Sequence, residues 1–216
     1  KDIVATGLSS SATIVDPADD AVGLTMSAAG GSIVASMAST PPDSTYVKNT
    51  SQALVARLVL TAGTAEDVKI TQIKIGANDE GAGSATACEV GDLTTAVATT
   101  ADTETGSLTL YVDGVAVTVA KDLTNVASDT DTVTYSGSDF LSNVIVTAGN
   151  QVAFDLKLNI KLVSADDLCF GIEAAADVKG SGLSSGASID STGTGVSQDM
   201  VFAAAGGLTV ALDAAS

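Results

Sequence analysis

The fold is decided by the alternating stretch Val152-Ala153-Phe154-Asp155-Leu156-Lys157-Leu158-Asn159-Ile160-Lys161-Leu162. Successive side chains of a β-strand point to opposite faces, so this period of two predicts a long strand with one face in a hydrophobic core and one in water. Residues 54–60 alternate in the same way, and residues 68–75 do so with a one-residue slip at Thr71-Gln72 that predicts a β-bulge. Long antiparallel strands therefore dominate the expected structure.

A short hairpin follows from the residues 108–119. Two alternating apolar segments, 108–112 and 115–119, flank Asp113-Gly114, a dipeptide that favours a type I′ turn. No stretch carries a capped apolar period of 3.6 residues, so the sequence predicts an all-β fold, an antiparallel β-sandwich of immunoglobulin-like or jelly-roll type. Further strands are expected near residues 22–27, 32–38, 94–99, 132–136, 143–147 and 199–213.

The end of the chain restates its beginning. Residues 2–14 align without gaps to residues 177–189, with Gly-Leu-Ser-Ser-x-Ala-x-Ile in common, and residues 28–35 align to 204–211 after one residue of slippage. Such self-similarity is the signature of repeated structural units. We therefore expect one unit of about 175 residues followed by the opening of a second.

This repeat divides the chain into a β-sandwich unit, residues 1–176, and a partial second copy, residues 177–216. Either the two copies take equivalent places in one closed domain, or the second copy adds strands to the sheet of a neighbouring molecule. A likeness through Ser, Gly and Ala composition alone is the remaining explanation, and the ordered match speaks against it.

Donated strands would give head-to-tail contacts, which propagate into a filament unless the rotation closes a ring. The donated or swapped region would comprise residues 182–189 and 200–212, with residues 8–14 and 26–34 as its counterpart. The residues predicted at the subunit interface are Gly182, Leu183, Ile189, Met200, Phe202, Leu208, Val210 and Leu212.

Composition narrows the classes of partner. The chain has 9 basic and 26 acidic residues and a formal charge of −17, so the clustered cations that contact nucleic-acid phosphates or anionic lipids are missing. No apolar run of 18 residues could cross a bilayer as a helix. With 45% apolar residues the chain can nevertheless bury a core, and its acidic surface suits solvent exposure.

An active site is not expected. Histidine and tryptophan are absent, so the usual serine triad cannot form. Carboxylate pairs for glycoside hydrolysis usually accompany aromatic platforms for sugar, and aromatic residues make up only 3% of the chain. We predict that the protein is not an enzyme and needs no cofactor.

Cys88 and Cys169 are the only cysteines and lie in strand-like segments far apart in the sequence. We interpret them as one disulfide, the alternative being two buried free thiols. A disulfide implies an oxidising compartment, so the expected location is extracellular, at a cell surface.

Two candidate surface sites remain. Asp16, Asp19 and Asp20 lie beside a proline and could offer carboxylates to Ca²⁺, although their spacing is not that of an EF-hand loop and a solvated turn is the simpler interpretation. Asn49-Thr50-Ser51 fits the N-glycosylation pattern, with Asn49 as the acceptor.

Several of these segments resemble known modules. Residues 53–63 followed by 66–73 resemble the A-x-F-x-L-T-A and E-D-V-x-I-x-x-I strands of repeat modules in large secreted bacterial surface proteins, with Leu58 where those modules usually carry Phe. The hairpin at 110–114 and the opening at 182–187 look similar to elements of the same modules. The chain also resembles subunits of donor-strand-complemented extracellular filaments, which implies a β-sandwich that polymerises by strand exchange.

The leading expectation is therefore a structural subunit of an extracellular, pilus-like homopolymer joined by β-strand complementation. The alternatives are an adhesin or carbohydrate-binding module of a larger surface protein, and a surface-layer subunit with lateral contacts. A sugar site would need an exposed aromatic side chain, for which Tyr46, Tyr111 and Tyr135 are the candidates.

Overall fold

The computed structural model describes residues 4–6, 13–15, 30–79, 88–90, 93, 105–124, 131–161 and 167–203. Within these residues the chain forms β-strands and two short 3-10 turns, η2 (Gly137–Asp139) and η3 (Ala175–Asp177). The strands belong to a large sheet, a smaller sheet and a separate two-stranded hairpin.

The large sheet has nine strands among the described residues, in the order β15-β14-β6-β13-β17-β4, with β10 and β11 also paired to β6 and β16 paired to β13. All of its pairs are antiparallel except β17 with β4. Its strands are β4 (Ser44–Val47), β6 (Val68–Asp79), β10 (Asp131–Ser136), β11 (Ile145–Val146), β13 (Asp167–Ile172), β14 (Val178–Gly182), β15 (Ser188–Asp190), β16 (Gly195–Val196) and β17 (Met200–Ala203).

The smaller sheet has the order β3-β5-β12-β7-β8, with β9 paired to β7. Its strands are β3 (Ile33–Met37), β5 (Ala53–Ala62), β7 (Thr105–Val112), β8 (Val115–Ala116), β9 (Lys121–Asp122) and β12 (Gln151–Ile160). The remaining pair, β1 (Val4–Thr6) and β2 (Thr13–Val15), forms a hairpin that shares no ladder with the described strands of either sheet.

One hydrophobic core joins the two sheets and makes the fold an all-β sandwich. Phe154 on the smaller sheet and Tyr135, Phe170 and Phe202 on the large sheet are fully buried in it. Tyr135 satisfies its hydroxyl by donating to the carbonyl oxygen of Leu108 across the core, at 2.6 Å. Because buried polar groups need a partner, this bond allows a tyrosine in an otherwise apolar interior.

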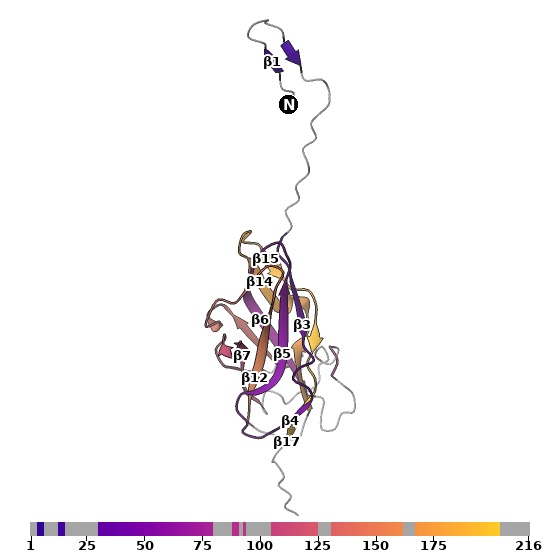
Figure 1. Ribbon diagram of the computed structural model, residues 1–216. Coiled ribbons are helices and arrows are strands. Elements are labelled where there is room, and N and C mark those ends of the chain that lie inside the picture. Colours follow the sequence, from indigo (N-terminus) through magenta and orange to yellow (C-terminus); the bar gives the residue numbers. More distant parts are fainter. Residues whose placement is uncertain are drawn as a thin grey trace, which may run out of the picture.

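The body has two ends, which β5 connects. The hairpin end is formed by the 63–67 connection after β5, by the β14–β15 turn and by Gly31 just before β3. The β17 end lies at the start of β5, where the Lys48 amide donates to the Ala203 carbonyl. Figure 1 shows β14 and β15 at the top of the body and β4 and β17 at the bottom, so the chain enters the body at one end and leaves it at the other.

The strongest sequence predictions are confirmed. β12 and β5 cover the alternating stretches, and the register between β14 and β6 skips Thr71, the predicted bulge. Asp113 and Gly114 have φ values of 50° and 79°, the positive values that a type I′ turn requires. The expected strands at 22–27 and 94–99 lie outside the described residues, and β4 was not predicted.

Candidate assembly interface: two matching hairpins and one seat

The hairpin β14–β15 comes from the second copy of the repeat. Its strands pair Lys179 with Asp190, Gly180 with Ile189 and Ser181 with Ser188. The Gly182 amide donates to the Ala187 carbonyl and closes the turn.

The hairpin β1–β2 comes from the first copy and has the same register. Its ladder pairs Val4 with Val15, Ala5 with Ile14 and Thr6 with Thr13. Subtracting 175 from each partner in β14–β15 gives these same three pairs, so the repeat found in the sequence is also a repeat of backbone pairing. The difference between the two hairpins lies in their surroundings: among the described residues, β14 pairs onward with β6, whereas β1 pairs only with β2.

We call the site that receives β14–β15 the hairpin seat, and define it as β6 residues 68–73, Gly31, Ile33 and Glu66. β14 pairs with β6 from Val178 opposite Ile73 to Gly182 opposite Val68. A methyl group at Gly180 would lie 2.6 Å from Cγ1 of Val68 and 2.8 Å from Cδ1 of Ile33, so the seat requires glycine at that point.

A second close approach fixes β15. Ile189 is buried, and a methyl group added to Gly31 would lie 2.8 Å from its Cδ1 atom. Glycine at position 31 thus lets the start of β3 pass directly over the hairpin.

Glu66 holds the turn of the hairpin. Its Oε2 accepts the backbone amides of Ser184 and Ser185 at 2.9 Å each, and its Oε1 accepts the Ser185 hydroxyl at 2.7 Å and the Gly31 amide at 3.0 Å. The side chain is nearly buried. These donors, the Ser185 hydroxyl first, lower the pKa of Glu66 from 4.5 to about 2, because each stabilises the carboxylate form. One carboxylate therefore ties together β3, the 63–67 connection and the hairpin.

Glu66 is not among the site residues predicted from the sequence. A signal was present in the serine pair, which occurs at 9–10 in the first copy and at 184–185 in the second. Its partner Glu66 lies 118 residues before Ser184, and only the folded structure brings the two together.

The predicted interface residues fall into three groups. Met200 and Phe202 on β17 are fully buried in the chain's own core, and Ile189 and Gly182 lie in the chain's own hairpin. Leu183 is half-exposed in the hairpin turn. Leu208, Val210 and Leu212 lie outside the described residues.

The C-terminal described strand also forms an unusual pair. β17 runs parallel to β4, with Phe202 opposite Tyr46 and their ring centroids 6.3 Å apart. The Tyr46 hydroxyl donates to the Leu54 carbonyl at 2.7 Å. The second copy therefore supplies strands at both ends of the body.

The predicted disulfide is confirmed. Cys88 and Cys169 are bonded, with 6.3 Å between their Cα atoms, and close a loop of 81 residues onto β13. Loops of that size restrict the unfolded chain by about 4 kcal/mol in the entropy model.

The candidate calcium ligands Asp16, Asp19 and Asp20 lie outside the described residues, and the described part of the chain contains no group of three acidic or cysteine side chains able to hold a metal ion. Asn49 is exposed, with a φ of 67°, in a turn between β4 and β5. The position is therefore accessible to a modifying enzyme.

The three tyrosines considered for sugar binding differ in how far their side chains are buried. Tyr135 is fully buried, whereas Tyr46 and Tyr111 are half-buried. The Lys157 ammonium lies 4.3 Å from the centroid of the Tyr111 ring, so one face of that ring is already covered.

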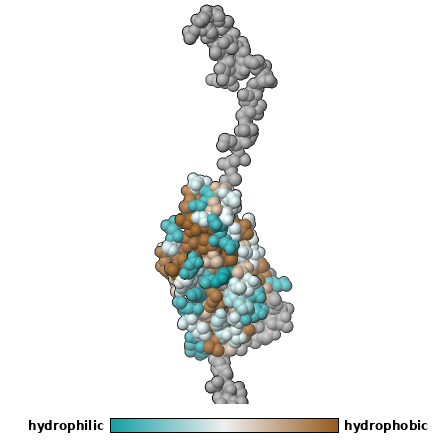
Figure 2. All heavy atoms as spheres, viewed as in Figure 1, coloured by the Kyte–Doolittle hydropathy of each residue, from teal (hydrophilic) through white to brown (hydrophobic). Residues whose placement is uncertain are grey.

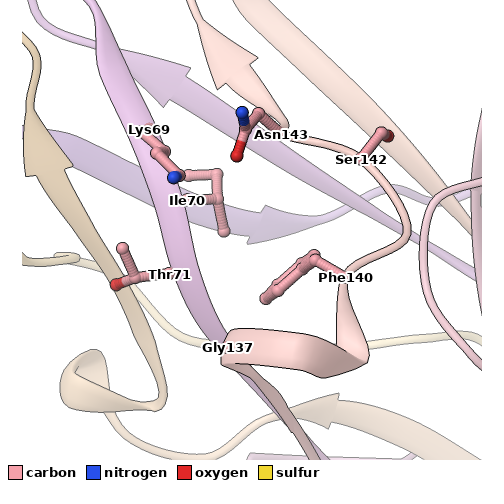
Figure 3. A pocket seen from close by; sticks show the side chains of 7 residues that line it. All are labelled: Lys69, Ile70, Thr71, Gly137, Phe140, Ser142 and Asn143. Atoms are coloured by element: carbon pink, nitrogen blue, oxygen red, sulfur yellow. The ribbon is translucent and has the colours of Figure 1, made fainter.

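One surface pocket lies between β6 and the loop after η2 (Figure 3). Ile70 and Phe140 point into this cavity of about 190 Å³, and Lys69 is the one ionisable side chain among its lining residues. A pocket with a single ammonium group offers no acid–base pair for catalysis.

The surface also carries apolar residues. Figure 2 shows brown, apolar residues gathered on the left of the body, the side on which β7 is labelled in Figure 1. Val115 and Ile145 are exposed and line a shallow hollow with Val117 and Val144.

Comparisons with known proteins give no relative: no family model, no curated protein and no solved structure matches the chain. None of the described segments is a helix long and apolar enough to cross a membrane.

Proposed function

We propose that this protein is a structural subunit of an extracellular, pilus-like filament in which units join head to tail by β-strand complementation. The observation that carries the proposal is the matching register of β1–β2 and β14–β15, two hairpins from opposite ends of the chain of which one already completes a sheet. A chain with a spare copy of one of its own sheet elements has what is needed to complete a second molecule.

The chain enters and leaves the body at opposite ends, which supports a polymer that grows along the long axis of the body. Gly31 lies at the hairpin end and Ala203 at the β17 end, with the ten-residue strand β5 between them. Contacts made through the two ends would be heterologous, and heterologous contacts that do not close into a ring give filaments.

The disulfide and the charge support a location outside the cell. A structural disulfide is characteristic of oxidising compartments, and a formal charge of −17 keeps an exposed surface hydrated. In this proposal the protein is neither an enzyme nor a nucleic-acid-binding protein, and its partner is a second copy of the same chain.

Negative-stain electron microscopy of the full chain beside a variant lacking residues 1–29 tests the proposal. A truncation before Asp177 is less suitable because it would remove β14, β15, β16 and β17 from the body. We expect filaments from the full chain, and folded monomers, checked by a thermal melt, from the shortened one. Monomers from the full chain at every concentration would contradict the filament.

A module of a longer surface protein is the second candidate, as an adhesin or a unit of a surface layer. It is favoured by the repeated Ala-Ala-Gly-Gly, which stands at 28–31 before β3 and again at 204–207 after β17. In a covalent array the same linker would join consecutive units, and an isolated unit would stay monomeric in the microscopy experiment.

A further inference from the structure

We propose that the hairpin seat is also the acceptor for the β1–β2 hairpin of a second copy of this chain, which would replace β14–β15 in the same register. The inference rests on the proposed head-to-tail assembly and identifies its donor and acceptor. Exchange of one element for its duplicate is domain swapping, in which the bonds lost and gained are nearly the same.

The residues that the seat recognises are present in the first copy. Glu66 binds two consecutive serines, which correspond to Ser9 and Ser10. Gly182, where a methyl group would collide with the Glu66 carboxylate, corresponds to Gly7, and buried Ile189 corresponds to Ile14.

The tether is long enough for the exchange. Val15 precedes Ile33 by 18 residues, and an extended chain reaches roughly 3.3 to 3.6 Å per residue, or about 60 Å in all. The ten residues of β5 span the body and correspond to about 30 Å. A hairpin leaving the hairpin end of one unit can therefore run along a neighbour stacked on that end and reach the neighbour's own seat.

Two sequence differences between the hairpins favour β14–β15 over β1–β2 in the hairpin seat. Ala5 corresponds to Gly180, where a methyl group would lie 2.6 Å from Cγ1 of Val68 and 3.0 Å from the Lys69 carbonyl oxygen. Ser11 corresponds to Gly186, whose φ of 68° disfavours any residue with a side chain. These differences keep β14–β15 in the seat of a free molecule and leave exchange to high local concentrations.

Disulfide trapping between full-length chains tests the assignment. One chain carries Val4→Cys and the other Gln72→Cys, because Lys179, the equivalent of Val4, lies opposite Gln72. The chains are mixed under oxidising conditions, and the peptide linked between positions 4 and 72 is quantified by mass spectrometry. Since the cysteines are on separate chains, a hairpin that folds onto its own body gives no signal. Val4→Cys with Lys69→Cys is the register control, because Lys69 lies opposite Ser181, the equivalent of Thr6 and not of Val4.

We expect the 4–72 link to form above the control. Ala5→Gly in the donor or Gly180→Ala in the acceptor should each raise its yield about tenfold or more, since each changes the balance by one overpacked methyl group. Ser11→Gly in the donor should also raise the yield, and Ser10→Ala, which removes the hydroxyl that Glu66 would accept, should lower it.

The outcomes separate this inference from the proposed function when the same samples are viewed by electron microscopy. Filaments without the 4–72 link would overturn the inference and leave the filament in place. The link without filaments would support the swap and overturn the filament. Monomers without the link, even with Ala5→Gly and Gly180→Ala combined, would overturn both.

Discussion

The two hairpins of this chain have the same strand pairing and different surroundings. β14–β15 is inserted between β6 and the solvent, with Val178 and Ile189 in the core and its turn held by Glu66. β1–β2 has the same three cross-strand pairs and, within the part of the chain that the structure describes, no ladder to a sheet of the body. An isolated two-stranded hairpin is marginally stable in water, so the seat, and not the hairpin, provides most of the stability of β14–β15.

The largest expected difference between the hairpins comes from their matching isoleucines. Ile189→Ala should lower the free energy of unfolding by about 2–4 kcal/mol, because it leaves a cavity beneath the start of β3. Ile14→Ala, its counterpart, should change the unfolding of the monomer by less than about 0.5 kcal/mol. Urea unfolding of both variants measures the two values, and equal losses would show that β1–β2 packs as tightly as β14–β15.

The next largest change in the free energy of unfolding is expected at Gly180, the glycine that packs against the hairpin seat. Gly180→Ala should cost about 1–3 kcal/mol through overpacking against Val68 and Ile33. Gly186→Ala, at a positive φ with open space around it, is the control for a backbone effect alone and should cost about 1 kcal/mol. A smaller loss at 180 than at 186 would mean that the seat adjusts to a side chain, and that Ala5 is no obstacle to exchange.

Acid should loosen the seated hairpin through Glu66. The pKa of Glu66 in the folded chain is lowered to about 2 from an ordinary value of 4.5, so its contribution is complete above about pH 4.5 and is lost as the pH falls from there towards 2. Melting temperatures of the wild type should fall across this window, and those of Glu66→Gln should fall less steeply.

The melting temperature of Glu66→Gln is still expected to fall somewhat in acid. The pKa of Asp139 is also lowered, by the Ser136 amide and by Lys121, so this carboxylate still takes up a proton in acid. Identical acid profiles for the wild type and Glu66→Gln would contradict the role of Glu66 in holding the turn.

The smallest change in stability is expected at the cross-strand pair of Lys179 with Asp190, where the two hairpins differ in sequence. Lys179 and Asp190 form an exposed ion pair at 3.7 Å, and the first copy has Val4 and Val15 at these positions. Exposed ion pairs contribute little, so Lys179→Val with Asp190→Val should change the stability by no more than about 0.5 kcal/mol. A loss above 2 kcal/mol would show that the pair distinguishes the hairpins after all.

The local features of the fold could be predicted from the sequence because each is set by a few adjacent residues. The alternation along β12, the bulge at Thr71 and the turn at Asp113-Gly114 are of this kind. The fold class followed from their sum.

The features that could not be predicted depend on residues far apart in the chain. The parallel pairing of β17 with β4 leaves no trace in local alternation, since both are four-residue strands. The carboxylate of Glu66 looked like one acidic surface residue among many until the fold placed the Ser184 and Ser185 amides around it. The duplicated hairpin was visible in the sequence, but its seat was not.

The opposite placement of Gly31 and Ala203 has a mechanical consequence. A tensile force applied through these two points runs along β3 and β5, so it loads their hydrogen bonds in shear, and the ladder must yield as a set instead of opening bond by bond. The bond between Cys88 and Cys169 keeps the chain of 81 residues between them from extending. At roughly 3.5 Å per residue, about 280 Å of the roughly 600 Å of chain between Gly31 and Ala203 cannot be stretched while this bond is intact, so an unfolded unit would extend only about half as far as one without the disulfide.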